Sequence, residues 1–393
     1  MKLLIVITVV NQFSKNINIK LTRKEGVLTL SFFLFSLNIY ANDYLKYNFI
    51  EKKDTYILSG QIDGYSSSLP FDIFEKDWDS LPSDKKINKA YGKIYFDLGY
   101  NSNYDLKVGI FSQKEAYLEL NDGFINTWYS ATKDWTTLVN KKTFSDIPSI
   151  PIDGYGNYSY TKGIYLQKVL KLSNKHHISA KAKFFAGEQM QDIKTYGYNS
   201  ETRFNLLVDY YYTDKNIITK SEQHDDSFSG YGYGFDLEYI YQDDRFYIYT
   251  GILNIGASID WDSITYMHYE FDSDNLSKYD PDHPQVKLPL ASGYYKFDIS
   301  YSQKLPRYYK GIVDYKIDDM VSIGDSLFYY DKDLISNELY TSLNLKNSFY
   351  KLGYFYENKV VNFGYGYKNI NIEVSNKFGT SNTILNGSYK ISF

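Results

Sequence analysis

Hydrophobic and polar residues alternate along most of this chain. In residues 229–242 (SGYGYGFDLEYIYQ), one face holds Tyr231, Phe235 and Leu237, and the other holds Asp236 and Glu238. A period of two is typical of a β-strand, because successive side chains point to opposite faces. The segment is therefore predicted to be a strand with one apolar and one polar face, long enough to cross a membrane.

Three further segments, 90–100, 177–187 and 294–302, show the same alternation. The polar faces of the four segments give the candidate lumen-lining residues: Lys93, Asp97, Lys181, Lys183, Asp236, Glu238, Lys296 and Asp298. The opposite faces are predicted to contact lipid, with Tyr231, Phe235, Leu237, Tyr295, Phe297, Ile299, Ile391 and Phe393 outside and Lys390 inside.

From residue 336 to the end, strand-like segments follow one another almost without loops. Breaks are expected at 346–347, 357–358, 368–369 and 379–380, where Asn or Gly occurs. These residues tolerate the positive φ that tight hairpin turns require. The C-terminal part is therefore predicted to be an antiparallel meander.

The fold class is predicted to be all-β, with a single antiparallel transmembrane β-barrel. Alternation also fits a soluble sandwich, but the apolar faces are rich in Tyr and strand segments continue without a domain break. No fixed repeat indicates a solenoid or propeller. A tilted membrane strand takes about 9 to 11 residues, and with turns and loops we expect about 16 strands, within a range of about 14 to 18.

Composition supports strands rather than membrane helices. The chain is 43% hydrophobic, yet its mean hydropathy is −0.43, which excludes a bundle of apolar helices. Its 44 Tyr residues outnumber 25 Phe, and a ring with a hydroxyl suits the boundary between lipid and water. The chain has no Cys, so it has no disulfide or thiolate metal site.

The N-terminal part resembles an export signal. The apolar run VLTLSFFLFSLNIYA at 27–41 follows Arg23 and Lys24 and is shorter than a membrane-spanning helix. Cleavage is expected after Ala41, which divides the chain into an extension and signal peptide (1–41) and a barrel (42–393). Removing five basic residues and one acidic residue changes the net charge from −4 to −8. Such a chain is not expected to bind nucleic acid.

Three stretches are predicted to be longer loops: 64–86, 131–153 and 271–291. They contain seven of the eight Pro residues and many acidic residues. Loops of this length in a membrane barrel usually lie outside the cell or fold into the lumen.

The last ten residues, ILNGSYKISF, resemble the C-terminal strand of bacterial outer-membrane β-barrels. Tyr389, Ile391 and Phe393 match the alternating hydrophobic pattern that ends on Phe, while Gly387 departs from it. The resemblance implies location in the outer membrane, with lipid as a partner. It also implies that the barrel-assembly machinery reads this ending during biogenesis.

The first functional hypothesis is a porin-like channel for passive diffusion of small polar solutes or ions. A barrel of about 16 strands can hold a water-filled lumen. Arg is scarce after residue 41, with only Arg203, Arg245 and Arg307, so lysines would have to line a constriction. No enzymatic activity, metal or cofactor is expected. The number of subunits stays open.

Two alternatives remain. One is a closed barrel with a structural, assembly or adhesin role. The other is an outer-membrane hydrolase, because His177 and Ser179 resemble the His-x-Ser arrangement of outer-membrane phospholipases. In this chain Ala180 and Lys181 replace the Asn-Gly that follows in that family.

Overall fold

The structure is a computed structural model. It describes residues 53–66, 87–102, 104–121, 123–124, 150–199, 204–213, 229–272, 290–330, 334–345, 348–356, 360–367, 370–376 and 383–392. The predicted signal peptide and its cleavage after Ala41 lie outside the described residues.

The described residues form one antiparallel sheet of sixteen strands. Their bounds are β1 (Thr55–Ser66), β2 (Ile87–Asn101), β3 (Leu106–Asn121), β4 (Ile150–Lys171), β5 (His176–Asn199), β6 (Phe204–Tyr212), β7 (Ser229–Gln242), β8 (Phe246–Asp272), β9 (Leu290–Lys304), β10 (Tyr308–Lys316), β11 (Val321–Tyr330), β12 (Leu334–Leu345), β13 (Ser348–Phe355), β14 (Val360–Tyr367), β15 (Ile370–Asn376) and β16 (Thr383–Ser392). The predicted all-β class and strand number are confirmed.

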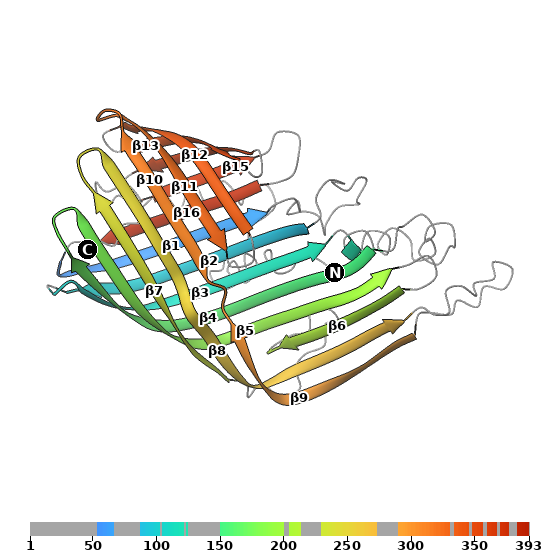
Figure 1. Ribbon diagram of the computed structural model, residues 1–393. Helices are drawn as coiled ribbons and strands as arrows, with labels where there is room; N and C mark the ends of the chain where they lie inside the picture. Colours follow the sequence, from blue (N-terminus) through green and yellow to red (C-terminus); the bar gives the residue numbers. More distant parts are fainter. Residues whose placement is uncertain are drawn as a thin grey trace, which may run out of the picture.

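The sheet closes on itself. β1 pairs with both β2 and β16, and β10 pairs with both β8 and β11. Between these points each strand pairs with its neighbour, so the hydrogen-bonded ring has no edge. The chain forms a single antiparallel β-barrel, shown in Figure 1.

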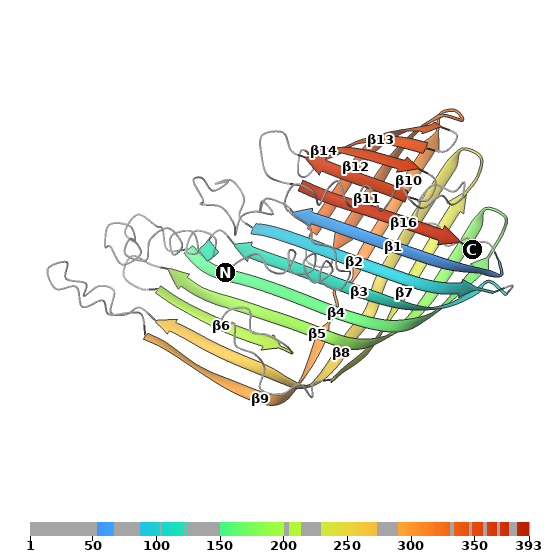
Figure 2. The same ribbon diagram turned by 180° about the vertical axis from the view of Figure 1, so that it is seen from behind.

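Two places in the ring are each shared by two strands. β6 and β7 lie end to end between β5 and β8, and β9 and β10 lie end to end along β8. Sixteen strands therefore fill fourteen places. β6, β9 and the adjoining ends of β5 and β8 project beyond the ring as a curved sheet, which we call the extension (Figures 1 and 2).

Bulges bend β8 and β9 where the barrel passes into the extension. The register of β8 shifts against β7 near Asn254 and Gly256, whose φ angles are both 59°. It shifts against β9 at Ser263 (φ 56°) and at Asp298 of β9 (φ 55°). A bulge adds an unpaired residue to one strand and increases its bend.

The two ends of the barrel differ in their connections. At one end, which we call the turn end, the links between β2 and β3, β4 and β5, β7 and β8, β10 and β11, β12 and β13, and β14 and β15 are four residues or fewer. The loop end carries the long links β1–β2, β3–β4 and β8–β9, together with the extension. Outer-membrane barrels show this asymmetry, with short turns toward the periplasm.

The predicted meander and loops can be compared with these bounds. Strand boundaries flank the four breaks expected after residue 336. The three loop predictions fall largely outside the described residues, but β1 runs to Ser66, β4 begins at Ile150 and β8 runs to Asp272. The strands therefore enter the loop ranges 64–86, 131–153 and 271–291 at their ends.

The outer surface of the ring is apolar. Exposed side chains include Leu98, Val108, Ile110, Ile164, Phe184, Phe235, Leu237, Val313, Ile323, Leu339, Leu352 and Phe363. Aromatic pairs bound this band: Tyr56 packs on Tyr100 at the turn end, with ring centres 5.1 Å apart, and Tyr309 packs on Tyr329 toward the loop end, at 5.6 Å. An apolar band between aromatic girdles is the lipid-facing surface of an outer-membrane barrel.

Tyrosine also fills the interior, which the sequence analysis did not expect. Tyr165, Tyr249, Tyr308 and Tyr330 are among the largest fully buried side chains. Near the bulges Trp261 is fully buried against Gly230, where an added Cβ would lie 2.5 Å from the indole ring. The excess of Tyr is therefore a property of the inner face as well as of the girdles.

In the part of the chain that the structure describes, no helix is long and apolar enough to cross a membrane.

Candidate functional site

The candidate site is the inner face of the ring. Strand alternation places charged and polar side chains there, and many of them are buried: Lys93, Asp97, Lys107, Gln113, Glu115, Asn157, Thr161, Gln167, Lys183, Asp236, Lys310, Asp314, Glu338 and Asn362. The interior is thus polar, whereas the outside is apolar.

Most of the predicted lumen-lining residues lie on this inner face. Lys93, Asp97, Lys183 and Asp236 are buried there, and Lys181 and Glu238 are half-buried on the same faces of β5 and β7. On the neighbouring positions, Leu98, Phe184 and Leu237 are exposed on the outside. That these residues line an open passage stays a prediction.

The placement of Lys296 and Asp298 was wrong. Both are exposed on β9, which pairs only with the projecting half of β8 among the described strands and lies past the closed ring. The left-handed backbone at Asp298 also interrupts the alternation on which the prediction depended. Tyr295 and Phe297 are exposed on the same strand, so both faces of this part of β9 are exposed, unlike the two faces of the ring.

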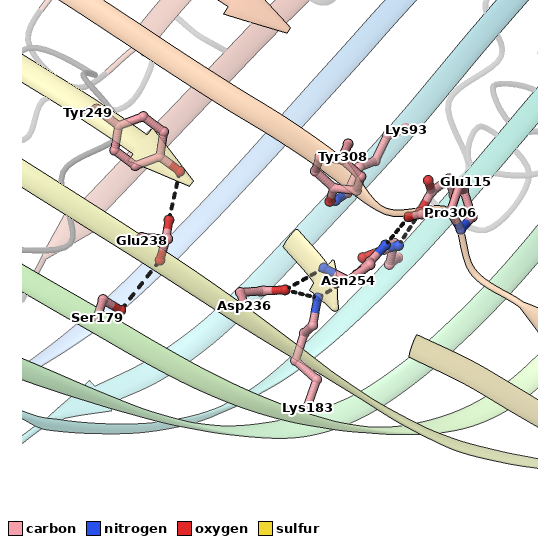
Figure 3. A network of polar contacts seen from close by, with 11 residues as sticks. Lys93, Glu115, Ser179, Lys183, Asp236, Glu238, Tyr249, Asn254, Pro306 and Tyr308 are labelled. Atoms are coloured by element: carbon pink, nitrogen blue, oxygen red, sulfur yellow. Dashed lines mark hydrogen bonds and ion pairs between the residues drawn. The ribbon is translucent and has the colours of Figure 1, made fainter. Parts of the chain in front are cut away.

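A buried ion pair joins β5 and β7. Lys183 Nζ lies 2.7 Å from Asp236 Oδ1, and both side chains are almost fully buried. Asn254 in the β8 bulge supports the pair, because its backbone N–H donates to Asp236 Oδ1 at 2.9 Å and its side-chain oxygen accepts from Lys183 at 2.7 Å. Its amide also donates to the carbonyl of Pro306 at 3.1 Å (Figure 3).

The residues of the predicted hydrolase pair share one face of β5, but Ser179 has other hydrogen-bond partners. Ser179 accepts a hydrogen bond from Gln167 Nε2 at 2.7 Å and donates one to Glu238 at 3.4 Å. Glu238 also accepts from Tyr249, at 2.9 Å (Figure 3). Within the described residues no hydrogen bond joins His177 to Ser179, although both lie buried on the inner face of β5. Activation of a serine requires such a bond.

Two contacts cross the barrel from β10. Lys93 of β2 donates a hydrogen bond to the Tyr308 hydroxyl. Lys310 Nζ lies 3.4 Å from Asp63 Oδ2 of β1. β1 and β2 lie on the opposite side of the ring from β10. The interior at this level is therefore spanned by side chains.

Aromatic rings cross the barrel beside these contacts. We call this group the aromatic belt: Tyr91 of β2, Tyr117 of β3, Tyr308 of β10, and Phe328 and Tyr330 of β11. Tyr117 stacks on Tyr330 with ring centres 4.8 Å apart, and Tyr91 lies 5.0 Å from Tyr330. The belt was not predicted, because alternation alone does not show that rings on distant strands meet.

A second polar network lines the wall formed by β12 to β15. Lys351 Nζ lies 2.7 Å from Glu338 and 3.0 Å from Glu373. Asn362 donates to both carboxylates, at 2.5 and 3.0 Å. These strands are neighbours in the ring, so this network strengthens one wall and does not bridge the interior.

No group of three or more His, Asp or Glu side chains suited to a metal ion occurs in the part of the chain that the structure describes.

The predicted assembly signal lies on the closing strand, β16, where Ile391 pairs with Leu58 and Tyr389 with Gly60 of β1. Phe393, the last residue of the predicted assembly signal, lies outside the described residues, and the side chains of β16, including that of Lys390, are not described.

Comparison with known proteins assigns neither a family nor a function. No protein-family model and no curated protein matches the chain. Among solved structures, the toluene transporter TodX of Pseudomonas putida is 8% identical, with 88% of this chain and 89% of that chain covered and a TM-score of 0.41. A FadL homologue of Pseudomonas aeruginosa is also 8% identical (86% and 87%; TM-score 0.38). The outer-membrane protease OmpT of Escherichia coli is 9% identical (88% and 100%; TM-score 0.25).

The chain folds as a closed antiparallel β-barrel of the kind found in outer membranes. The closed ring and the apolar band between aromatic girdles carry that statement. The likenesses to solved structures are too low to align individual residues or to transfer an activity.

Proposed function

We propose that this barrel is an outer-membrane channel for small polar solutes or ions, with a constriction where Lys93 meets Tyr308 and Lys310 meets Asp63. The supporting observation is the inner face itself, which presents ionisable side chains on strands all around the ring. The turn end faces the periplasm and the loop end faces the outside, as in other barrels of this kind.

A purely stabilising role does not explain the charged side chains on the inner face. Burying an ion pair costs more free energy of desolvation than a well-packed apolar replacement does. A barrel that only had to be filled would therefore be as stable with Leu or Ile at these positions. A polar wall is needed where water and solutes pass.

The crossing contacts suit a constriction that can open. Lys93 and Lys310 end in ammonium groups on flexible four-carbon stems. Each can turn aside without any change in the backbone of the ring. The two lysines also take the place that arginines would have in an Arg-lined constriction.

Single-channel recording tests the proposal, and the absence of native Cys makes a labelling control simple. Refolded protein in a planar bilayer should give discrete conductance steps. In Lys310→Cys the inner side chain is replaced, and a thiol-reactive cation added in solution should change the step size. In Tyr309→Cys the neighbouring outer side chain is replaced, and the reagent should have no effect. Equal responses of the two variants would contradict a passage along the inner face.

A closed barrel with a structural role is the second candidate, and the aromatic belt favours it. Stacked rings from β3 and β11 leave contacts across the interior that no single lysine movement removes. This candidate would be supported if the unmodified protein showed no conductance and variants with truncated side chains in the aromatic belt did.

We propose no catalytic role for the interior, because Ser179 is bonded to Gln167 and Glu238 rather than to a histidine. The partners that we propose are lipid at the outer band and the barrel-assembly machinery at β16. The proposed location is the outer membrane, after removal of the signal peptide.

A further inference from the structure

The extension carries a cluster of aromatic and charged side chains on one face. Asp209 of β6 pairs with His268 of β8, and His268 pairs with Tyr294 of β9. Tyr266 lies beside them, opposite Lys296. Tyr196 of β5 and Glu270 of β8 complete the group, which we call the vestibule cluster: Tyr196, Asp209, Tyr266, His268, Glu270, Tyr294 and Lys296.

The vestibule cluster lies on the continuation of the inner face. Paired residues of an antiparallel sheet share a face. Asn157, which is buried on the inner face of β4, pairs with Asp192, Asp192 with Tyr211, and Tyr211 with Tyr266. Tyr301 of β9 confirms this side, because its hydroxyl donates to Asp192 at 3.0 Å and its ring stacks on Tyr211 at 4.2 Å.

The cluster also lies outside the lipid-facing band. Tyr231 of β7, the exposed ring nearest the loop end of that strand, pairs with Ala186 of β5 and Asp260 of β8. The cluster residues of β5 and β8 lie farther along these strands, in the projecting part (Figure 1). A solute approaching from the loop end meets them before it reaches the belt.

Hydrogen bonds to Asp209 fix the polar part of the cluster. Its carboxylate accepts from Tyr266 at 2.6 Å, from His268 Nδ1 at 2.8 Å and from Tyr196 at 3.3 Å. Partial burial raises the pKa of Asp209, but the bonds from Tyr266 and His268 outweigh that effect and lower the pKa below its ordinary value. The carboxylate therefore stays charged and holds three side chains in place.

Several groups of the cluster remain available to a ligand. The rings of Tyr196 and Tyr294 are 44% and 47% exposed. Because Nδ1 of His268 bonds to Asp209, its Nε2 faces away from that carboxylate. Within the described residues Glu270 makes no hydrogen bond or ion pair, and Lys296 Nζ contacts only ring faces, 5.4 Å from the centre of Tyr294 and 5.9 Å from that of Tyr266.

We propose that the vestibule cluster binds a saccharide. A sugar ring presents an apolar C–H face that can lie on a tyrosine ring and a rim of hydroxyls that both donate and accept hydrogen bonds. Tyr196 and Tyr294 offer the ring faces, Glu270 offers an acceptor, and His268 Nε2 and Lys296 offer further polar groups. The mixture of both charge signs on one surface suits a hydroxyl-rich ligand better than a hydrocarbon or a simple ion.

The proposal does not depend on conduction, so binding is measured directly. Refolded protein in a detergent without a sugar headgroup is titrated calorimetrically with maltohexaose, with chitohexaose and with deacylated lipopolysaccharide. Binding of one of the first two would indicate a dissolved glycan as the natural ligand, and binding of the third a glycan of the cell surface. Either result supports the site, provided that the variants below behave as expected.

Variants distinguish binding at the vestibule cluster from general effects of substitution. Tyr196→Ala and Glu270→Gln should each weaken binding about tenfold, the change expected for loss of one good contact. Tyr196→Phe keeps the ring and should bind nearly as well as the unmodified protein. The matched control is Tyr104→Ala, which removes an 80% exposed ring at the turn end and should leave binding unchanged. Altered gel mobility of unheated samples confirms that each variant has folded.

Three outcomes would overturn the proposal. One is the absence of binding with all of the probes at millimolar concentration. Another is undiminished binding in the folded Tyr196→Ala, Glu270→Gln double variant. The third is equal weakening by Tyr104→Ala, which would show that the sugar contacts surface tyrosines in general.

Discussion

Lys93 and Tyr308 meet across the interior of the barrel. The Lys93 ammonium nitrogen lies 4.6 Å from the centre of the Tyr308 ring, although the two residues belong to β2 and β10 on opposite sides of the ring of strands. At this level the free width of the interior depends in part on these two side chains. Shortening one of them should therefore change the passage more than any change on the outer wall.

Truncation of Tyr308 tests this relationship. Tyr308→Ala should raise the single-channel conductance by about twofold or more, because conduction depends on the radius of the narrowest point. The matched control is Tyr309→Ala, which removes the neighbouring ring from the outer girdle. Unchanged conductance in Tyr308→Ala would place the narrowest point elsewhere.

Breaking the buried ion pair between Lys183 and Asp236 should lower the free energy of unfolding. Asp236→Asn leaves the buried ammonium group of Lys183 without its counter-charge, and we expect the free energy of unfolding to fall by about 3 kcal/mol. Urea unfolding of the refolded protein in lipid vesicles measures the change.

The control for this prediction is an exposed pair of similar length. Lys162 Nζ lies 3.1 Å from Glu188 Oε1, with both side chains about half exposed. Glu188→Gln should therefore cost less than about 1 kcal/mol. A loss as large as that of Asp236→Asn would mean that burial of the inner pair contributes nothing.

Adjacent residues of β7 test the orientation of the wall. Leu237 is exposed on the outer band, so Leu237→Arg should destabilise the barrel by about 2 to 4 kcal/mol near the middle of the bilayer. Glu238 lies on the inner face, where Glu238→Arg should cost less. Equal losses in urea unfolding would contradict the assigned faces.

The vestibule cluster predicts a dependence of stability on pH. The pKa of Asp209 is lowered in the folded chain, so its hydrogen bonds stabilise the fold above its unfolded pKa of about 3.9. This contribution should be lost as the pH falls from about 4 through the lower folded value. Asp209→Asn should flatten the pH dependence of unfolding in this window and leave it unchanged near neutrality.

Ion selectivity should be weak and cationic. The inner charges largely pair with each other, as in Lys183 with Asp236 and Lys107 with Asp97, so they give the interior little net sign. The acidic residues toward the loop end should supply the bias, which is screened beyond about 10 Å at 0.1 M salt. Reversal potentials in a KCl gradient should show a cation preference that fades as salt rises. Clear anion selectivity would contradict this prediction and show that Lys93 and Lys310, rather than the acidic residues, determine the sign of the selectivity.

The sequence predicts the wall of the barrel well because alternation is a local property. In β7 the separation of Leu237 from Asp236 is correct, since each position depends only on the strand period. On β9 the same reasoning fails. Positive φ at Ser263 of β8 and Asp298 of β9 introduces bulges, and a single Ser or Asp in an alternating segment does not predict them.

The contents of the interior are less predictable for a different reason. Tyr suits both an interfacial girdle and a buried hydrogen-bonded position. Tyr309 and Tyr308 are neighbours in sequence, yet the first packs in the outer girdle and the second joins the aromatic belt. Which rings meet across the lumen depends on the strand register of the whole ring. The vestibule cluster was missed for the same reason, because it combines residues of β5, β6, β8 and β9.

The pairing of β1 with β16 has a consequence for the order of assembly. Most strand pairs in the ring join segments that follow one another closely, and these can form as soon as the two strands exist. The seam joins Ile57 to Ser392, near opposite ends of the sequence, so the entropy of closing so long a loop must be overcome before the contact stabilises anything. Until then β1 and β16 are both unpaired edges that can pair with another chain. An assembly factor that pairs with either edge would therefore act late, at the step in which β1 and β16 pair and the open sheet closes into a barrel.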